Sequence, residues 1–281
     1  MNPPPRQGIV ARLALWVAAP FASTARHRTL LAKLIQRDVE TRFRGTVLGK
    51  VWVAVAPLLL LVLYTVIFGG LIQPRWQSQV ADPVVVPFVY FTGLIVFQFF
   101  VEALARAPNL MREHKVFIKK VLFPVEILAP MAVGSAGVRL IIGLAILLVA
   151  NLVLLGLPPL TVILIPLLVL PLIVATAGIV WLLAAAGTYV RDLSQAVTVL
   201  APVLMFASPV FYPLDAVPQP ARTALLFNPL SIPIEGLRAA LVAGAITDWG
   251  LIAAHAVLSL LLACLGYHFF RRVRGGFADV L

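Results

Sequence analysis

The sequence predicts an all-α integral membrane protein with six transmembrane helices. Of its 281 residues, 62% are hydrophobic and 12% are charged, whereas a soluble domain would carry about 25% charged residues. Apolar runs of about 20 residues, enough for a helix to cross ~30 Å of hydrocarbon, recur along the chain. Its 22 Lys and Arg residues outnumber 11 Asp and Glu, and they lie between these runs, which favours a membrane face over nucleic acid as the reason for the excess.

Six runs qualify as candidate spans, and they differ in quality. The first has no charged residue, the second carries Glu102 near its end, and the third is interrupted by Arg139. The fifth is short and contains Pro202 and Pro209, which makes it marginal as a simple crossing. The six candidates are residues 51–72, 84–105, 127–155, 160–187, 196–212 and 251–270.

The distribution of basic residues predicts the orientation. If the N-terminus is cytoplasmic, 18 of the 22 basic residues lie in inside segments, three (Arg75, Arg222 and Arg238) lie outside, and Arg139 lies within a span. Such an asymmetry is the positive-inside signal. It predicts a cytoplasmic segment over residues 1–50, a six-span permease domain over 51–270, a cytoplasmic tail over 271–281, and both termini in the cytoplasm.

The first residues allow two interpretations. Arg6 and Arg12 precede a short apolar run at 13–21 and small residues at 22–25, an order typical of a cleavable signal peptide. The segment that follows is strongly basic and resists translocation, however, so a surface-lying or loosely ordered cytoplasmic segment is the preferred interpretation.

Residues 29–44 have the pattern of an amphipathic helix. Apolar side chains recur every three or four positions, with charged residues on the opposite face. Such a helix just before a first span is expected to lie along the cytoplasmic interface, with its cations near anionic headgroups. The alternative is a segment that only anchors the topology.

The inside segment 106–126 is longer than a simple connection requires. Its centre mixes the charged Arg112, Glu113, His114 and Lys115 with the apolar residues at 116–118. This predicts a short helix parallel to the membrane that docks on a cytosolic partner through its charges. The alternative is a solvated basic loop.

The outer segment 213–249 is rich in proline yet keeps apolar runs. It is too apolar for a free loop and too broken for a span, so it predicts re-entrant half-helices in the outer leaflet, between spans five and six. Glu235 and Arg238 are three residues apart and therefore placed to form a pair on one helical turn. Within the spans, Glu102 can reach the interface, and Arg139 is either deep or interfacial, depending on where its helix begins.

Motifs of catalysis are missing from the sequence. There is no phosphate-binding glycine loop, no metalloprotease motif and no nucleophile elbow. The four His residues are dispersed, and Cys264 is the single cysteine, so neither a metal site nor a disulfide is expected. We therefore expect no enzyme activity and no cofactor in this chain, and a transporter without its own energy source needs a partner that supplies it.

Several segments together resemble the type-2 ATP-binding-cassette permeases that export polysaccharides. RFRGTVLGKVW (42–52) resembles the arginine-rich approach to their first span, and FIKKVLFP (117–124) with EILAP (126–130) resembles the segment after their second. RDL (191–193), ASPVFYP (207–213), NPL (228–230), EGLR (235–238), FF (269–270) and FADV (277–280) follow in the family's order. Thr46 and Val125 depart from the pattern, and the first 29 residues have no clear counterpart.

The resemblance implies a homodimer with two copies of a separate cytosolic ABC ATPase, which would bind ATP and Mg²⁺. Arg112, Glu113, His114 and Lys115 would then form the ATPase-coupling segment. The cargo would be a polysaccharide on undecaprenyl diphosphate, which crosses the inner membrane of a bacterium. The interface cations expected near the lipid diphosphate are Arg37, Arg42 and Arg44. Aromatic residues expected along the sugar path, or else in an interfacial belt, are Tyr64, Phe68, Phe97, Phe99, Phe100, Phe206, Phe211 and Tyr212.

Three other functions are open to a chain of this composition. A drug or small-lipid exporter of the same superfamily is disfavoured by the fifth-span and tail motifs. An integral-membrane enzyme acting on lipid-linked sugars would need an acid/base or metal constellation. A passive assembly anchor would have no use for re-entrant half-helices.

Overall fold

The computed structural model describes residues 9–42, 44–45, 47–67, 85–118, 123–246 and 248–281. Within these ranges the chain is all-helical and contains no strand, as the sequence predicts. The α-helices are α1 (Ile9–Arg26), α2 (Arg28–Arg42), α3 (Trp52–Val66), α4 (Val85–Arg106), α5 (Leu110–Glu113), α6 (Lys115–Ile118), α7 (Leu128–Leu154), α8 (Ile165–Tyr189), α9 (Leu193–Phe206), α10 (Ala221–Leu226), α11 (Ser231–Arg238), α12 (Trp249–Val273) and α13 (Phe277–Val280).

Four helical stretches among the described residues are long and apolar enough to cross a membrane, which makes this a membrane protein. They are Val85–Glu113, Val125–Leu154, Leu160–Tyr189 and Trp249–Gly276. The first and fifth expected spans correspond to α3 and α9, which have 15 and 14 residues. At 1.5 Å per residue each is about 22 Å long, short of the ~30 Å hydrocarbon core. Residues 68–72 of the first expected span lie outside the described ranges, so the count of six stays a prediction.

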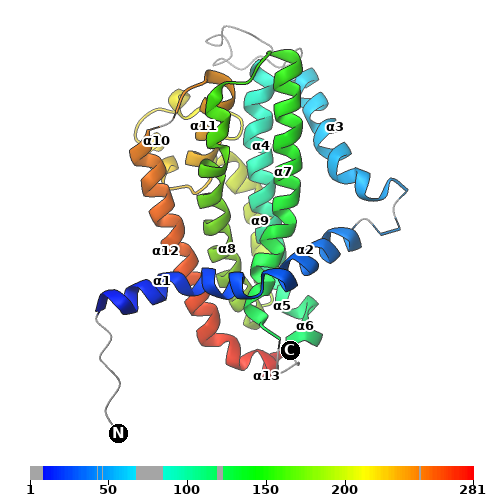
Figure 1. Ribbon diagram of the computed structural model, residues 1–281, viewed down its shortest axis with the longest axis vertical. Coiled ribbons are helices and arrows are strands. Elements are labelled where there is room, and N and C mark those ends of the chain that lie inside the picture. Colours follow the sequence, from blue (N-terminus) through cyan, green and yellow to red (C-terminus); the bar gives the residue numbers. More distant parts are fainter. Residues whose placement is uncertain (1–8, 43, 46, 68–84, 119–122, 247) are drawn as a thin grey trace.

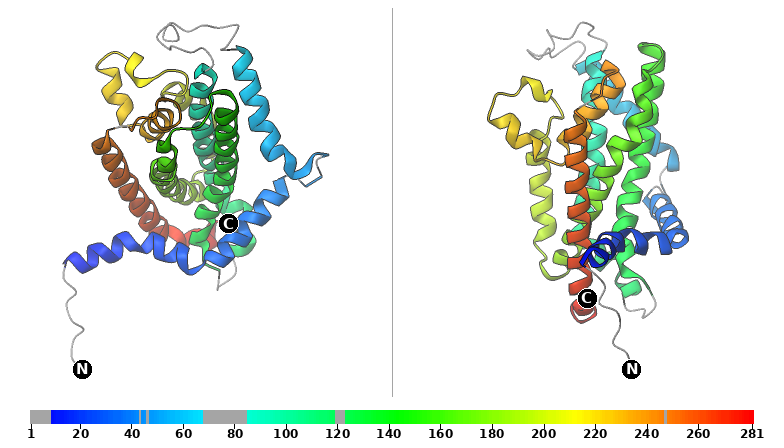
Figure 2. Two further views of the ribbon diagram at one scale, coloured as in Figure 1. Left: turned by 45° about the horizontal axis from the view of Figure 1, so that its top comes forward. Right: turned by 60° about the vertical axis from the view of Figure 1, so that its left-hand side comes forward.

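The long helices form an upright bundle, and the short elements gather at its two ends (Figure 1). Helices α1 and α2 run across one end, which also carries α5, α6 and α13; we call this the α2 end. Helices α10 and α11 lie toward the opposite end, the α11 end. Helix α3 leans beside α4 and α7. In both further views α1 and α2 still cross the end of the bundle (Figure 2), and we call these two helices the belt.

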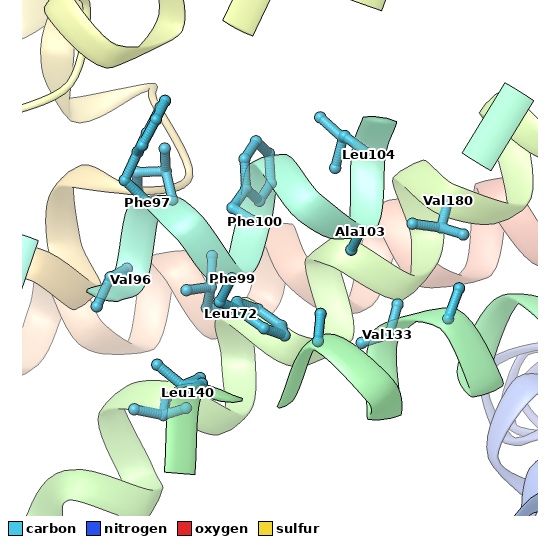
Figure 3. Packing of buried hydrophobic residues seen from close by; sticks show 14 of the residues in the cluster. Val96, Phe97, Phe99, Phe100, Ala103, Leu104, Val133, Leu140, Leu172 and Val180 are labelled. Atoms are coloured by element: carbon cyan, nitrogen blue, oxygen red, sulfur yellow. The ribbon is translucent and has the colours of Figure 1, made fainter. Parts of the chain in front are cut away.

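The core lies between α4, α7 and α8. Phe99 of α4, Val133 and Leu140 of α7, and Leu172 of α8 pack there with exposures of 3% or less (Figure 3). Helix α12 covers α8 on another side, where the two backbones touch. A Cβ atom on Gly266 would overlap the carbonyl group of Gly178, so these small residues permit the close helix contact that membrane proteins commonly use.

The belt is fixed to the bundle by both of its helices. In α1, the Trp16 ring stacks on His268 of α12 with ring centroids 4.8 Å apart. The backbone oxygen of Trp16 lies 3.0 Å from Nε2 of the same histidine. This arrangement agrees with a surface-lying first segment. Helix α2 begins at Arg28 and ends at Arg42, close to the expected range 29–44, and packs Leu31 and Ile35 against the core.

Candidate functional site

A cluster of five charged residues joins α2 to α4 and α7. Arg106 donates to both carboxylate oxygens of Asp38, at 2.8 and 2.7 Å, the two-pronged geometry that makes such pairs strong. Glu102 accepts from Arg42 at the end of α2 and also pairs with Arg139 of α7. With three guanidinium groups and two carboxylates, the cluster carries one net positive charge. We call these five residues the belt cluster.

The depth of Arg139 is decided by where its helix begins. Helix α7 starts at Leu128, eleven residues earlier, so Arg139 lies about 16 Å along the helix. Arg139 therefore lies well inside α7 and not at its start, and its level in the bilayer stays a prediction. Glu102 is not simply snorkelling, because its carboxylate is the shared acceptor of two arginines. Ionisable side chains within membrane-spanning helices are costly unless paired, and they commonly mark functional sites.

A cavity of about 360 Å³ extends from the belt cluster between α3, α4 and α7, within the usual range for ligand sites. Its polar lining consists of Arg42, Glu102, Arg139 and Gln98. The other walls are mainly apolar and include Trp52, Val53, Ala56, Pro57, Phe91, Leu94, Ile95, Phe99, Leu140 and Gly143. A cavity that is charged at one part and apolar elsewhere is suited to an amphiphile with an anionic headgroup.

The expected coupling segment is not one helix but two single turns, α5 and α6, separated at His114. Its first part is anchored, because Leu110 and Met111 are fully buried. Arg112 turns toward the bundle and donates to the carbonyl of Gly187 at 2.8 Å. Glu113 and Lys115 are exposed at the α2 end. The segment thus presents Glu113 and Lys115 outward, while Arg112 fastens it to α8.

The C-terminal tail supports the same end. Phe277 of α13 is buried, and its ring packs against Phe270 with centroids 5.3 Å apart. Arg274 donates to Glu126, just before α7, at 3.0 Å. The Tyr189 hydroxyl donates to the Val273 carbonyl at 3.0 Å. These contacts tie the tail to α8, to the end of α12 and to the residues just before α7.

The aromatic residues expected along a sugar path divide into two groups. Phe97, Phe99 and Phe100 of α4 are 7%, 2% and 3% exposed, and they pack inside the protomer (Figure 3). We correct the expectation for these three, because a ring enclosed by neighbouring helices offers no face to a passing chain. Phe68 lies outside the described residues.

The second group is gathered around Phe211. Its ring centroid lies 6.5 Å from that of Tyr64, 6.1 Å from Tyr90 and 6.2 Å from Phe206. The Tyr212 hydroxyl donates to the carbonyl of Phe206 at 2.8 Å. Phe206 itself is 66% exposed. The structure thus brings Tyr64 of α3 together with Phe206, Phe211 and Tyr212 from the end of α9 and the residues after it.

Arg238 fastens α11 into the bundle. Its guanidinium donates to the carbonyls of Val89, Val210 and Tyr212 at 2.9, 2.6 and 3.1 Å. It also pairs with Glu235 at 2.9 Å, the contact expected from their spacing. Glu235 in turn accepts from the Leu214 backbone at 3.2 Å. Through these contacts α11 is held against the first turns of α4 and against residues 210–214, which follow α9.

Comparison with known proteins places this architecture in a family. The model of the ABC-2 type transporter family matches residues 29–242, which include the belt cluster, the coupling segment and the Arg238 contacts. The chain belongs to the ABC-2 type transporter family. Its curated relatives include the O-antigen export system permease protein RfbA of Myxococcus xanthus, 26% identical over 255 residues, and that of Klebsiella pneumoniae, 23% identical over 253 residues. Each match covers 90% of this chain and 95% of the relative.

In this ABC-2 family member, the three interface cations expected from the sequence differ in position. Arg42 lines the cavity, whereas Arg37 and Arg44 are exposed and outside its lining. The partners that complete the site, Glu102 and Arg139, were recognised in the sequence as ionisable residues within spans. Nothing in the sequence indicated that they meet, because they come from different helices.

The stability that the Asp38–Arg106 pair gives to this ABC-2 protein is expected to decrease in acid. Burial by itself raises the pKa of the Asp38 carboxyl, but the hydrogen bond and positive charge of Arg106, together with Ser135 and Arg42, bring the pKa below its ordinary 3.8. A lowered folded-state pKa means that the pair stabilises fully above about pH 4 and progressively less as the pH falls through the folded value. We expect the melting-temperature difference between wild type and Asp38→Asn to stay constant from about pH 7 to 5 and to shrink below about pH 4. Asp192→Asn, at an exposed carboxylate, is the control, and a gap that persists in acid would contradict the assignment.

Proposed function

We propose that this chain is the membrane-spanning permease subunit of an ATP-driven exporter that moves lipid-linked polysaccharide across a bacterial inner membrane. The cargo is an O-antigen-like glycan on undecaprenyl diphosphate. The chain acts as a homodimer with six crossings per subunit and both termini in the cytoplasm. Two copies of a cytosolic ABC ATPase, which bind ATP and Mg²⁺, dock at the α2 end.

The observation that carries this proposal is the extent of the match to the relatives. Permeases named for O-antigen export align with 90% of this chain and with 95% of their own length. Family membership by itself supports only a permease that works with an ABC ATPase. The end-to-end match supports the finer choice of cargo.

The cavity beside the belt cluster supports a lipid-linked cargo. A diphosphate would meet Arg42 and Arg139, while the apolar walls from α3 and α4 would contact the adjoining lipid. Both arginines share a single carboxylate, Glu102, so an incoming anion can take one arginine without leaving the carboxylate unpaired. Arginine matches phosphate oxygens in a forked geometry, which suits this role.

The aromatic group around Phe211 supports a path for the glycan. Sugar rings slide over flat aromatic faces, and Tyr64, Phe206, Phe211 and Tyr212 provide several within one region. The exposed apolar faces of α3 and α9 are the surfaces through which we expect two subunits to meet. In the dimer this aromatic group would then line the passage between them.

Deletion of the gene tests the cargo. The expected result is polymer linked to undecaprenyl diphosphate that accumulates inside the cell, with loss of the polymer from the surface. Complementation with the wild-type gene should restore display. Unchanged display of the surface polymer would exclude this proposal and would favour a drug or small-lipid exporter instead.

Alanine substitution at Arg112–Lys115 tests the coupling segment. Replacing the outward Glu113 and Lys115 by Ala should reduce copurification with the ATPase subunit and its stimulated ATP turnover by about tenfold, because opposite charges fix such contacts. Arg112→Ala should instead lower the melting temperature, since it removes the bond to Gly187. Arg222→Ala, at a partly exposed cation of α10 and away from the α2 end, is the control. If the Glu113 and Lys115 double variant binds and stimulates normally, the coupling assignment is wrong.

A further inference from the structure

A second groove lies beneath the belt, separate from the cavity of the belt cluster. It is enclosed by α1, α2, α7, α8 and α12, with a volume of about 510 Å³, and its lining is almost entirely apolar. No residue of the proposed cargo site lines it. The lining residues are Pro20, Phe21, Thr24, Ala25, Arg28, Leu31, Ala32, Ile35, Pro130, Val133, Gly134, Leu170, Ile173, Val174, Ala177, Trp181 and Ala263.

The groove is long enough for a lipid tail. Along α8 it runs from Leu170 to Trp181, which is about 16 Å at 1.5 Å per residue. Half of the ~30 Å hydrocarbon thickness is about 15 Å. The groove therefore follows the bundle for roughly the depth of one leaflet, and its walls offer one acyl chain an apolar surface on several sides.

The edge of the groove formed by α2 carries a cation. Arg28, the one charged residue of the lining, begins α2. It is exposed, and no ion pair between it and a carboxylate is found among the described residues. A guanidinium without an acidic partner at the edge of an apolar groove complements an anionic headgroup joined to an acyl chain.

From these observations we infer that the groove binds an anionic glycerophospholipid of the surrounding bilayer. One acyl chain lies along α8, beneath the belt, and the phosphate lies against Arg28. The lipid bridges α1 and α2 to α7 and α8, and so stabilises the belt that carries Asp38 and Arg42. This inference does not depend on the identity of the exported cargo.

Lipid titration tests the headgroup preference. The full chain, purified in mild detergent, is titrated with phosphatidylglycerol or with phosphatidylcholine, and bound lipid is counted by native mass spectrometry. We expect tighter binding of phosphatidylglycerol. Arg28→Ala should weaken it about fivefold, the change that one cation near an anionic lipid headgroup produces. Lys33→Ala, an exposed cation of the same helix outside the groove lining, should leave the affinity unchanged.

Filling the groove tests the place of the acyl chain. Ala177→Phe puts a ring into the lining, and it should reduce phosphatidylglycerol binding to the level of Arg28→Ala or below. Ala145→Phe adds the same ring on an exposed face of α7 and should have no effect. Equal affinity for the two lipids, or full binding by Ala177→Phe, would overturn the inference. Displacement of phosphatidylglycerol by equimolar undecaprenyl phosphate would also overturn it, because the groove would then belong to the lipid carrier. Since no step measures transport, failure here is distinguishable from failure of the proposed export function.

Discussion

Arg238→Ala is expected to destabilise the folded protein by about 3–5 kcal/mol, the cost of removing one partner from a buried charged network. The Arg238 side chain is 6% exposed, and its guanidinium donates to three backbone carbonyls and to Glu235. Without it, the three carbonyls lose this donor and Glu235 loses its charge partner, and each loss is costly for a group removed from water. Helix α11 would lose its attachment to the start of α4.

Thermal unfolding in detergent measures this effect. Arg238→Lys should be intermediate between wild type and Arg238→Ala, because an ammonium cannot reach several carbonyls in different directions as the planar guanidinium does. Arg222→Ala is the matched control, since Arg222 pairs with Asp215 at 2.6 Å in the same segment between α9 and α12 but is far more exposed. Removing that surface pair should cost less than about 1 kcal/mol. Equal melting temperatures for Arg222→Ala and Arg238→Ala would contradict the prediction.

Glu102→Ala is expected to destabilise by about 2–3 kcal/mol and to loosen the belt. The substitution leaves Arg42 and Arg139 facing each other without their shared carboxylate, so attraction becomes repulsion. The cost is smaller than at Arg238 because these side chains are partly exposed. Hydrogen–deuterium exchange should increase in α2, whose last turn is held by this contact, and export should fall with it.

A double-mutant cycle separates this contact from general damage. Combining Glu102→Gln with Arg42→Gln should cost less than the sum of the single substitutions, with a coupling of about 1–3 kcal/mol. Asp192→Ala removes an exposed carboxylate at the start of α9 and should change stability by less than about 1 kcal/mol. Additive effects of Glu102→Gln and Arg42→Gln, or unchanged exchange in α2, would show that the belt is not held by Glu102.

Properties set by residues close together in the chain were predictable. Hydropathy located the four long helices, and the three-to-four-residue spacing located α2 within two residues at each end. The Glu235–Arg238 pair follows from a separation of three residues on one helix. In these cases helix geometry alone decides which side chains meet.

Other features depended on how the helices pack. Glu102 meets Arg42 and Arg139 only because α2 crosses the ends of α4 and α7. Phe99 and Phe100 are as apolar as a lipid-facing pair, yet they lie in the core. Lipid tails and neighbouring helices are equally apolar, so hydropathy cannot separate a surface that meets lipid from one that meets protein.

The sequence by itself thus determined that this is an all-helical membrane protein, the approximate extent of its main helices and its basic belt. It also supplied the segments that resemble polysaccharide-exporting permeases. Only the tertiary structure decided which charges share a carboxylate, which aromatic rings remain outside the core, and that a lipid-sized groove lies beneath the belt. The physical reason is that local spacing defines a helix and its faces, whereas the neighbour of each face is chosen by contacts between segments far apart in the chain.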